Sequence, residues 1–255
     1  MSALTPGRLL LVPTPLDFGC TEHTPIGDVL PAGTLAAAAS TAHWITENAK
    51  TTRAFLKRVG EHTPLRVPLQ QQTLTELPRE LHKKGDHGSA IDTRPMLQAA
   101  LDGADMGLVS EAGMPAVADP GSSVVRAAHE LGLQVVPLVG PVSILLALAA
   151  SGLNGQNFAF VGYLPQDAAD RTQRIRQLEA LSLQTGQTQM WIETPYRNAA
   201  MMDALLQTLQ SGTRLAVASG LTLGSAQVRS QRVSQWKLDQ NQRPAAVPAV
   251  FAIGP

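Results

Sequence analysis

The segment Gly107–Gly121 constrains the fold of this chain more than any other part of the sequence. The apolar run Met106–Val109 stops abruptly at Ser110, a second break comes at residues 119–121 (Asp-Pro-Gly), and a helical pattern begins at Ser122. This order predicts a buried strand that ends in a loop of small residues and then leads into a helix. In open α/β sheets the ligand crevice lies at the carboxyl ends of the strands, so the segment predicts a small-molecule site.

Short apolar runs alternate with helical patterns over the first part of the chain. The runs Arg8–Pro13 and Gln134–Leu138 are continuous, which is typical of strands that are buried on both faces of a parallel sheet. In the last third, predicted strands follow one another without helices between them, and Gln227–Val233 alternates as an antiparallel strand does. Residues 60–93 are rich in Gln, Pro, Lys and Gly, and we expect them to be the least regular part.

These patterns predict an α/β protein of two domains. The break at residues 139–141 (Val-Gly-Pro) is the sharpest internal one, and it divides residues 1–139 from residues 140–255. The first domain is expected to hold a mostly parallel sheet and the second a mixed sheet.

Composition and motifs exclude several classes of protein. The chain has 20 basic and 20 acidic side chains, so only a local patch could attract nucleic acid. Cys20 is its one cysteine and its histidines have no metal-ligand spacing, so we expect neither disulfides nor a bound metal. The predicted strands lead into no dinucleotide fingerprint, phosphate-binding loop or Gly-x-Ser-x-Gly elbow. The longest apolar stretch, Ile144–Ala150, is too short to span a bilayer, and we expect a cytoplasmic protein.

Small residues gather in the loops that follow the predicted strands. Such residues let backbone amides and carbonyls approach a ligand closely, so these loops suit a cofactor that is bound by shape and by main-chain hydrogen bonds. The loops are residues 13–15, 110–115, 139–143, 163–165, 193–197 and 219–222.

In this order the loops resemble those of the tetrapyrrole (corrin/porphyrin) methylases, a superfamily of methyltransferases that use S-adenosylmethionine. Within it they are similar to the ribosomal RNA small-subunit methyltransferase I branch, which methylates a cytidine ribose 2′-hydroxyl. The branch carries a Ser-Asp-Ala-Gly-Thr-Pro signature followed by Asp-Pro-Gly, where this chain has Ser110–Pro115 and Asp119–Gly121. Its Pro-Gly-Pro-Ser-Ala, Gly-Phe-Leu-Pro and Glu-x-Pro-x-Arg elements correspond to residues 139–143, 162–165 and 193–197.

The resemblance implies two α/β domains with the cofactor, S-adenosylmethionine, in the cleft between them, and commonly a homodimer. Carried over position by position, it also implies which residues contact the cofactor. They are Pro13, Glu111, Ala112, Gly113, Met114, Val117, Val142, Ser143, Glu193, Thr194, Ser219 and Pro248.

Two elements depart from the pattern of the branch. Its Glu-Asp-Thr-Arg element appears as residues 47–50 (Glu-Asn-Ala-Lys), which keep the Glu and lose the Asp. Residues 218–223 lack the Glu and the Lys of its Arg-Glu-Leu-Thr-Lys element. The cofactor half of the signature is therefore better kept than the parts assigned to the substrate, and we expect a divergent paralogue whose substrate need not be the ribosomal cytidine.

Methyl transfer to a ribose hydroxyl benefits from a base, because the hydroxyl is a poor nucleophile at neutral pH. Glu47 is the candidate for this role, and Arg197 could orient an anionic substrate, but ion pairs that involve Glu47 or Glu193 are an equally good interpretation. Cations that could contact RNA phosphates are Lys50, Arg53, Lys57, Arg171 and Arg174. Two alternatives stay open: a methyltransferase that acts on a tetrapyrrole or another small molecule, and a protein that binds S-adenosylmethionine without catalysis.

Overall fold

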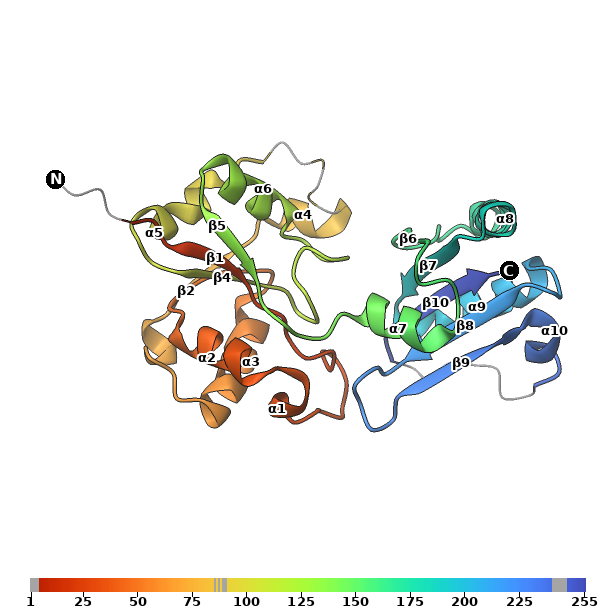
Figure 1. The fold of residues 1–255 in the computed structure, drawn as a ribbon, viewed down its shortest axis with the longest axis horizontal. Helices are drawn as coiled ribbons and strands as arrows, with labels where there is room; N and C mark the ends of the chain where they lie inside the picture. Colours follow the sequence, from red (N-terminus) through yellow and green to blue (C-terminus); the bar gives the residue numbers. More distant parts are fainter. Residues whose placement is uncertain (1–4, 85, 87, 89–90, 240–246) are drawn as a thin grey trace. The chain divides into compact units, whose positions relative to one another are not determined.

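The structure is a computed structural model that describes residues 5–84, 86, 88, 91–239 and 247–255 (Figure 1). Its contacts divide the chain into two compact units. The first unit runs to Gly19 and resumes over His23–Pro141, and the second unit comprises Cys20–Glu22 and Val142–Pro255. Each unit is described below by itself.

The first unit contains a five-stranded sheet in the order β3-β2-β4-β1-β5, and its neighbouring strands all pair in parallel. The parallel sheet predicted from the apolar runs is thereby confirmed, with β4 in the centre. Its strands are β1 (Arg8–Leu11), β2 (His43–Thr46), β3 (Thr73–Glu76), β4 (Met106–Val109) and β5 (Gln134–Pro137).

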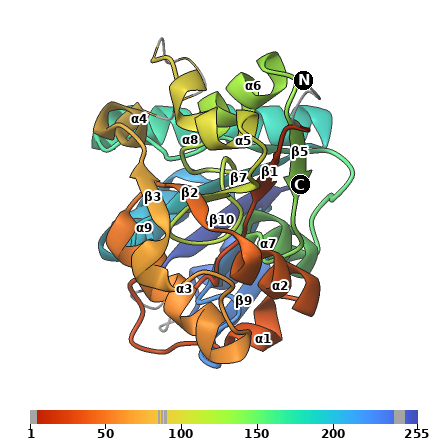
Figure 2. The ribbon, with the colours of Figure 1, turned by 90° about the vertical axis from the view of Figure 1, so that its left-hand side faces the viewer.

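Helices cover both faces of this sheet, with α1 to α3 on one side and α4 to α6 on the other (Figures 1 and 2). Successive strand residues point to opposite faces, so Leu9 packs beneath α6 while Leu10 packs with α2 and α3. The helices are α1 (Ile26–Val29), α2 (Ala32–Ser40), α3 (Ala49–His62), α4 (Arg79–Lys84), α5 (Gln98–Leu101) and α6 (Ser122–Glu130), with 3₁₀ turns η1 (Leu69–Gln71) and η2 (Arg94–Leu97).

Residues 60–93 are more regular than their composition suggested, and that expectation was wrong. They include η1, strand β3 and helix α4. Strand β3 lies at the edge of the sheet, where Thr73, Thr75 and Glu76 are exposed. An edge strand tolerates polar side chains because it has a strand neighbour on one side only. The polar composition therefore marked an edge, not a lack of structure.

The second unit contains a mixed five-stranded sheet in the order β6-β7-β10-β8-β9. Strands β6 and β7 pair in parallel, and the other pairs are antiparallel, as predicted for Gln227–Val233. The strands are β6 (Phe158–Phe160), β7 (Thr188–Glu193), β8 (Arg214–Ser219), β9 (Gln227–Arg232) and β10 (Ala249–Gly254). The helices are α7 (Ser143–Ser151), α8 (Ala168–Thr185), α9 (Asn198–Thr208) and α10 (Val233–Trp236), with the 3₁₀ turn η3 (Pro195–Arg197).

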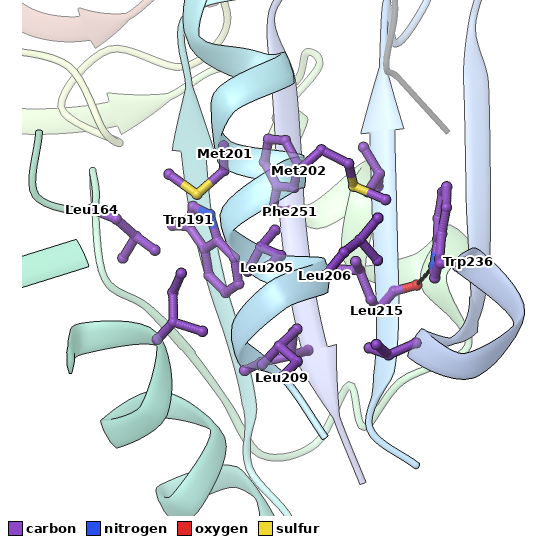
Figure 3. Packing of buried hydrophobic residues seen from close by; sticks show 14 of the residues in the cluster. Leu164, Trp191, Met201, Met202, Leu205, Leu206, Leu209, Leu215, Trp236 and Phe251 are labelled. Carbon is purple, nitrogen blue, oxygen red and sulfur yellow. Dashed lines mark hydrogen bonds between the residues drawn. The ribbon is translucent and has the colours of Figure 1, made fainter. Parts of the chain in front are cut away.

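Leucine and methionine side chains, together with three aromatic ones, form the core on one face of this second sheet (Figure 3). Trp191 and Phe251 are partners across β7 and β10, and their rings stack with centroids 6.1 Å apart. Trp236 is also buried, and its indole nitrogen donates to the carbonyl of Leu215 at 2.9 Å. Helix α7 packs on the other face through an apolar stripe that includes Leu148. Both faces of the central strand β10 are therefore covered.

Candidate functional site

Two loops at neighbouring strand ends of the first unit are bonded to each other. Thr14, beyond β1, donates its amide to the carbonyl of Gly113 at 3.0 Å, and the amide of Gly113 donates back to Thr14 at 3.1 Å. Gly140, in the loop after β5, approaches Pro13 so closely that a Cβ added to Gly140 would lie 2.3 Å from Pro13 Cγ. Three of the loops singled out in the sequence, those after β1, β4 and β5, thus meet at the carboxyl ends of the strands.

The loop after β4 holds an unusual backbone conformation. Gly113 has φ of +77°, and Ala116 and Ala118 have φ of +65° and +66°. The left-handed region costs a residue with a Cβ about 1–2 kcal/mol, so surrounding contacts must hold the two alanines there. One such contact is the hydrogen bond from the Ala116 amide to the carbonyl of Pro120. Thr222, in the loop after β8, is the third such residue in the part of the chain that is described.

Asp86 fixes the far end of this loop. Its buried carboxylate accepts hydrogen bonds from the amides of Gly121, Ser122 and Ser123 at 2.8–3.1 Å and from the two serine hydroxyls at 2.5 and 2.6 Å. Burial raises the pKa of Asp86, but the hydrogen bonds from Ser122 and Ser123 outweigh it and hold the pKa below its ordinary value. The carboxylate therefore caps helix α6, and sequence analysis missed this role.

Replacing Asp86 by alanine is expected to destabilise the first unit by about 3 kcal/mol, because five donors would lose a charged acceptor. Urea unfolding followed by Trp44 fluorescence measures this change, since Trp44 is the tryptophan of that unit. Asp92→Ala is the matched control: its carboxylate is exposed and pairs with Arg94, so a change below about 0.5 kcal/mol is expected. Equal effects of the two substitutions would contradict the capping role.

Three carboxyl groups converge beside the start of the same loop. The amide of Glu47 bonds to the carbonyl of Val109 at 3.4 Å, which extends the pairing of β2 with β4 and places Glu47 opposite Ser110. Burial and the charge of Glu47, followed by that of Glu111, raise the pKa of Asp119 from 3.8 to about 7, and the Ser110 hydroxyl opposes the rise. Asp119 was absent from the predicted site residues, although its place in a predicted ligand loop was a signal.

The residue after Glu47 caps helix α3. Asn48 Oδ1 accepts from the amide of Lys50 at 2.9 Å, a role that asparagine and aspartate fill about equally well. Asn48, which stands where the branch has Asp, therefore has a structural role in this chain. Lys50, Arg53 and Lys57 lie exposed along α3. The other two predicted RNA contacts, Arg171 and Arg174, lie on α8 of the second unit.

Several predicted residues of the second unit lie together at one end of three neighbouring strands, β7, β10 and β8. Ala249, at the start of β10, pairs with Glu193 at the end of β7 and with Ser219 at the end of β8. The carbonyl of Pro248 accepts from Gly220 at 3.4 Å. The side-chain amide of Asn198 donates to the carbonyl of Val247, the residue before Pro248, at 2.9 Å. Val142 and Ser143 cap and begin helix α7.

Glu193 and Arg197 form a buried ion pair. Arg197 Nη2 lies 2.6 Å from Glu193 Oε2, and the Thr194 amide donates to Glu193 Oε1 at 2.7 Å. The Glu193 side chain is 1% exposed and that of Arg197 is 21% exposed. The ion pair that the sequence left open for Glu193 is therefore present, and it holds the turn after β7.

The described residues include no group of three or more His, Cys, Asp or Glu side chains placed to hold a metal ion. In the same residues, every helix is too short or too polar to cross a bilayer.

A family model described as Tetrapyrrole (Corrin/Porphyrin) Methylases matches residues 34–236. Ribosomal RNA small subunit methyltransferase I from Escherichia coli O157:H7 is 28% identical over 241 residues, which is 93% of this chain and 74% of the relative. The protein of that name from Xylella fastidiosa is 30% identical over 84% of this chain and 67% of its own length. The matches to those from Vibrio cholerae (31% identical) and Mesorhizobium japonicum (35%) cover 54% and 58% of this chain but only about half of each relative, 46% and 48%.

Two solved structures share the fold. Uroporphyrin-III-C-methyltransferase from Thermus thermophilus superposes with a TM-score of 0.53 at 18% identity, over 97% of this chain and 94% of the other. The methyltransferase CobJ superposes with a TM-score of 0.56 at 16% identity, over the same shares. The predicted two-domain fold is confirmed by these likenesses.

Proposed function

This chain belongs to the tetrapyrrole (corrin/porphyrin) methylase family, whose members use S-adenosylmethionine as methyl donor, and we propose that it methylates a ribose 2′-hydroxyl of ribosomal RNA. This acceptor is supported by relatives named ribosomal RNA small subunit methyltransferase I, one of which matches 93% of the chain. The observation that carries the proposed site is the geometry of the loop after β4. This loop is bonded to the loop after β1 at its start and held by Asp86 at its end.

The residues present fit a donor that is bound by shape. The loop after β4 is held at its start by the paired bonds between Gly113 and Thr14 and at its end by Asp86 beneath Gly121, so the loop is ready for binding without reorganisation. Val117 is 41% exposed there and offers an apolar contact for a flat base. We propose that the donor contacts Pro13, Glu111, Ala112, Gly113, Met114 and Val117 in the first unit. For the second unit we keep Val142, Ser143, Glu193, Thr194, Ser219 and Pro248 as predictions.

When bound, the donor supplies an activated methyl group. In our proposal Glu47 accepts the proton of the attacking hydroxyl, which its position opposite Ser110 at the strand end supports. Arg197 is held by Glu193, so its proposed contact with an anionic substrate needs only the exposed part of the guanidinium. RNA contacts by the five predicted cations and a homodimer remain predictions.

The deciding experiment follows the label of radioactive S-adenosylmethionine. The protein is incubated with the donor and with cell extract from a strain that lacks this protein. RNA, protein and small molecules are then separated. Label in a nucleotide that resists alkaline cleavage is the expected result, because a 2′-O-methyl group blocks attack on the neighbouring phosphate.

Variants separate catalysis from contamination. Glu47→Gln is expected to lower the rate of label transfer by about a hundredfold or more, since a general base contributes about that much. Glu61→Gln, which changes an exposed glutamate on the following helix α3, is the matched control and leaves the rate unchanged. Label in small molecules instead of RNA would favour a tetrapyrrole-type substrate. Donor binding without any transfer would favour a protein that has lost catalysis.

A further inference from the structure

Both tyrosines of the chain lie in loops at the carboxyl ends of two neighbouring parallel strands of the second unit. Tyr163 stands three residues beyond β6 and is 56% exposed, and Tyr196, in the turn η3 after β7, is 81% exposed. The three tryptophans of the chain are buried by contrast. A large ring at the surface forgoes the free energy that its burial would gain, so two of them at the same end of one sheet indicate a surface that binds a partner.

The pairing of β6 with β7 brings the two loops together. Beyond the last paired residues of β6, the amide of Ile192 donates to the carbonyl of Gly162 at 3.1 Å. The peptide group that joins Gly162 to Tyr163 therefore lies directly beside β7. Ile192 stands only four residues before Tyr196, so one short ligand can contact both rings.

Each ring is presented by a turn whose next residue is held in place. Leu164, which follows Tyr163, is 2% exposed and packs in the core of the second unit (Figure 3). Arg197, which follows Tyr196, is held by its ion pair with Glu193. A tyrosine has only two side-chain torsions to fix, so a ring on an anchored turn binds a flat ligand at a small cost in conformational entropy.

Cationic groups accompany the two rings. The guanidinium of Arg171, on α8, donates to a backbone carbonyl of the segment between Tyr163 and that helix at 3.0 Å. Arg197 follows the second ring, and its side chain is 21% exposed. The acidic residue of the same segment, Asp167, is engaged as the N-cap of α8. Exposed rings beside cations are the combination that binds single-stranded nucleic acid, because the rings stack on bases while the cations attract phosphates.

We propose that Tyr163 and Tyr196 form a stacking platform for unpaired bases of the RNA substrate. The inference rests on the proposed function, because it takes RNA as the methyl acceptor, and it adds that the acceptor is a single-stranded segment. The bases of a duplex are stacked on one another, whereas the bases of a loop or an end can be splayed onto protein rings. Because every base has a π face, the platform holds the strand without selecting its sequence.

Fluorescence anisotropy with a labelled single strand of about ten uridines tests the platform, since a strand of this length suits known single-strand sites. Tyr163→Leu and Tyr196→Leu are each expected to weaken binding about tenfold, because one base stack contributes a change of about that size. Tyr196→Phe keeps the ring and is expected to bind within about twofold of the unaltered protein. The same strand in a duplex is expected to bind the unaltered protein and the leucine variants alike.

A strand without bases separates stacking from a structural role of the tyrosines. This strand keeps its phosphates, so the unaltered protein is expected to bind it about a hundredfold more weakly than the uridine strand, and each leucine variant to bind it as the unaltered protein does. Phe158→Leu is the matched control, because Phe158 is an exposed aromatic residue at the opposite, amino end of β6. It is expected to retain the full affinity for the uridine strand.

The outcomes distinguish the platform from the proposed function. If label from the methyl donor enters RNA but the leucine variants bind the uridine strand as the unaltered protein does, the platform is overturned and the proposed function stands. A leucine variant that loses affinity equally for the strands with and without bases also overturns the platform. If the unaltered protein neither binds nor labels RNA, both fail. Binding of uroporphyrin that is lost in the leucine variants would then assign the rings to a tetrapyrrole.

Discussion

Replacing Gly107 by alanine is expected to destabilise the first unit by about 3 kcal/mol, a large share of the stability of a domain. Gly107 lies in the central strand β4, and a Cβ there would stand 2.4 Å from two ring carbons of Trp44. The ring has no room to retreat, because Trp44 is fully buried and its indole nitrogen donates to Gln72 at 2.9 Å. Urea unfolding followed by circular dichroism measures the loss.

Two further variants isolate the clash from the general effect of adding a methyl group. Gly33→Ala, in helix α2, meets no atom within 4 Å and is expected to be neutral or stabilising by up to about 1 kcal/mol. In a Trp44→Leu background, Gly107→Ala is expected to cost at least about 1 kcal/mol less, because the clashing ring carbons are gone. Strict additivity of the two substitutions would argue against the contact as the cause.

Replacing Gly113 by valine is expected to weaken S-adenosylmethionine binding by about a hundredfold or more. A β-branched side chain is strongly disfavoured at φ of +77°, and its Cβ would stand 3.1 Å from Leu16 Cδ2 and 3.5 Å from the Pro141 carbonyl. Relief of this strain breaks the paired bonds to Thr14, so the loop after β4 separates from the loop after β1. Calorimetric titration with the donor measures the affinity.

Gly132→Val provides the matched control. Gly132 follows α6 with φ of +70°, yet a Cβ there meets nothing within 4 Å. Both substitutions therefore carry a similar backbone penalty, while only Gly113 joins the candidate site. Donor affinity is expected to be kept in Gly132→Val, and an equal loss in the two variants would show that global destabilisation, not loop geometry, is responsible.

The candidate site was predictable from sequence to different degrees in its parts. The loop 110–115 was visible because small residues directly follow an apolar run, and main-chain contacts between strand-end loops depend on such residues. Asp86 was invisible, because it stands in a polar segment and acts on a helix that begins 36 residues later. The position of Asp119 in the loop was predictable, but its raised pKa was not, because that pKa depends on burial and on charges that the fold brings to it.

The sequence by itself determined the α/β alternation, the parallel first sheet and the positions of its loops. These features follow from local periodicity and from glycine and proline, whose effects extend over a few residues. It also determined the family, because the motifs keep their order along the chain.

The tertiary structure decided which side chains act together. It turned the polar residues 73–76 into an edge strand, placed Asp86 under α6 and set Glu47 beside Ser110. Hydrogen bonds and charge interactions reach only a few ångströms, so their partners are fixed when distant segments fold together. A strand or a turn depends on neighbouring residues, whereas the cap by Asp86 and the shifted pKa of Asp119 depend on residues from distant segments.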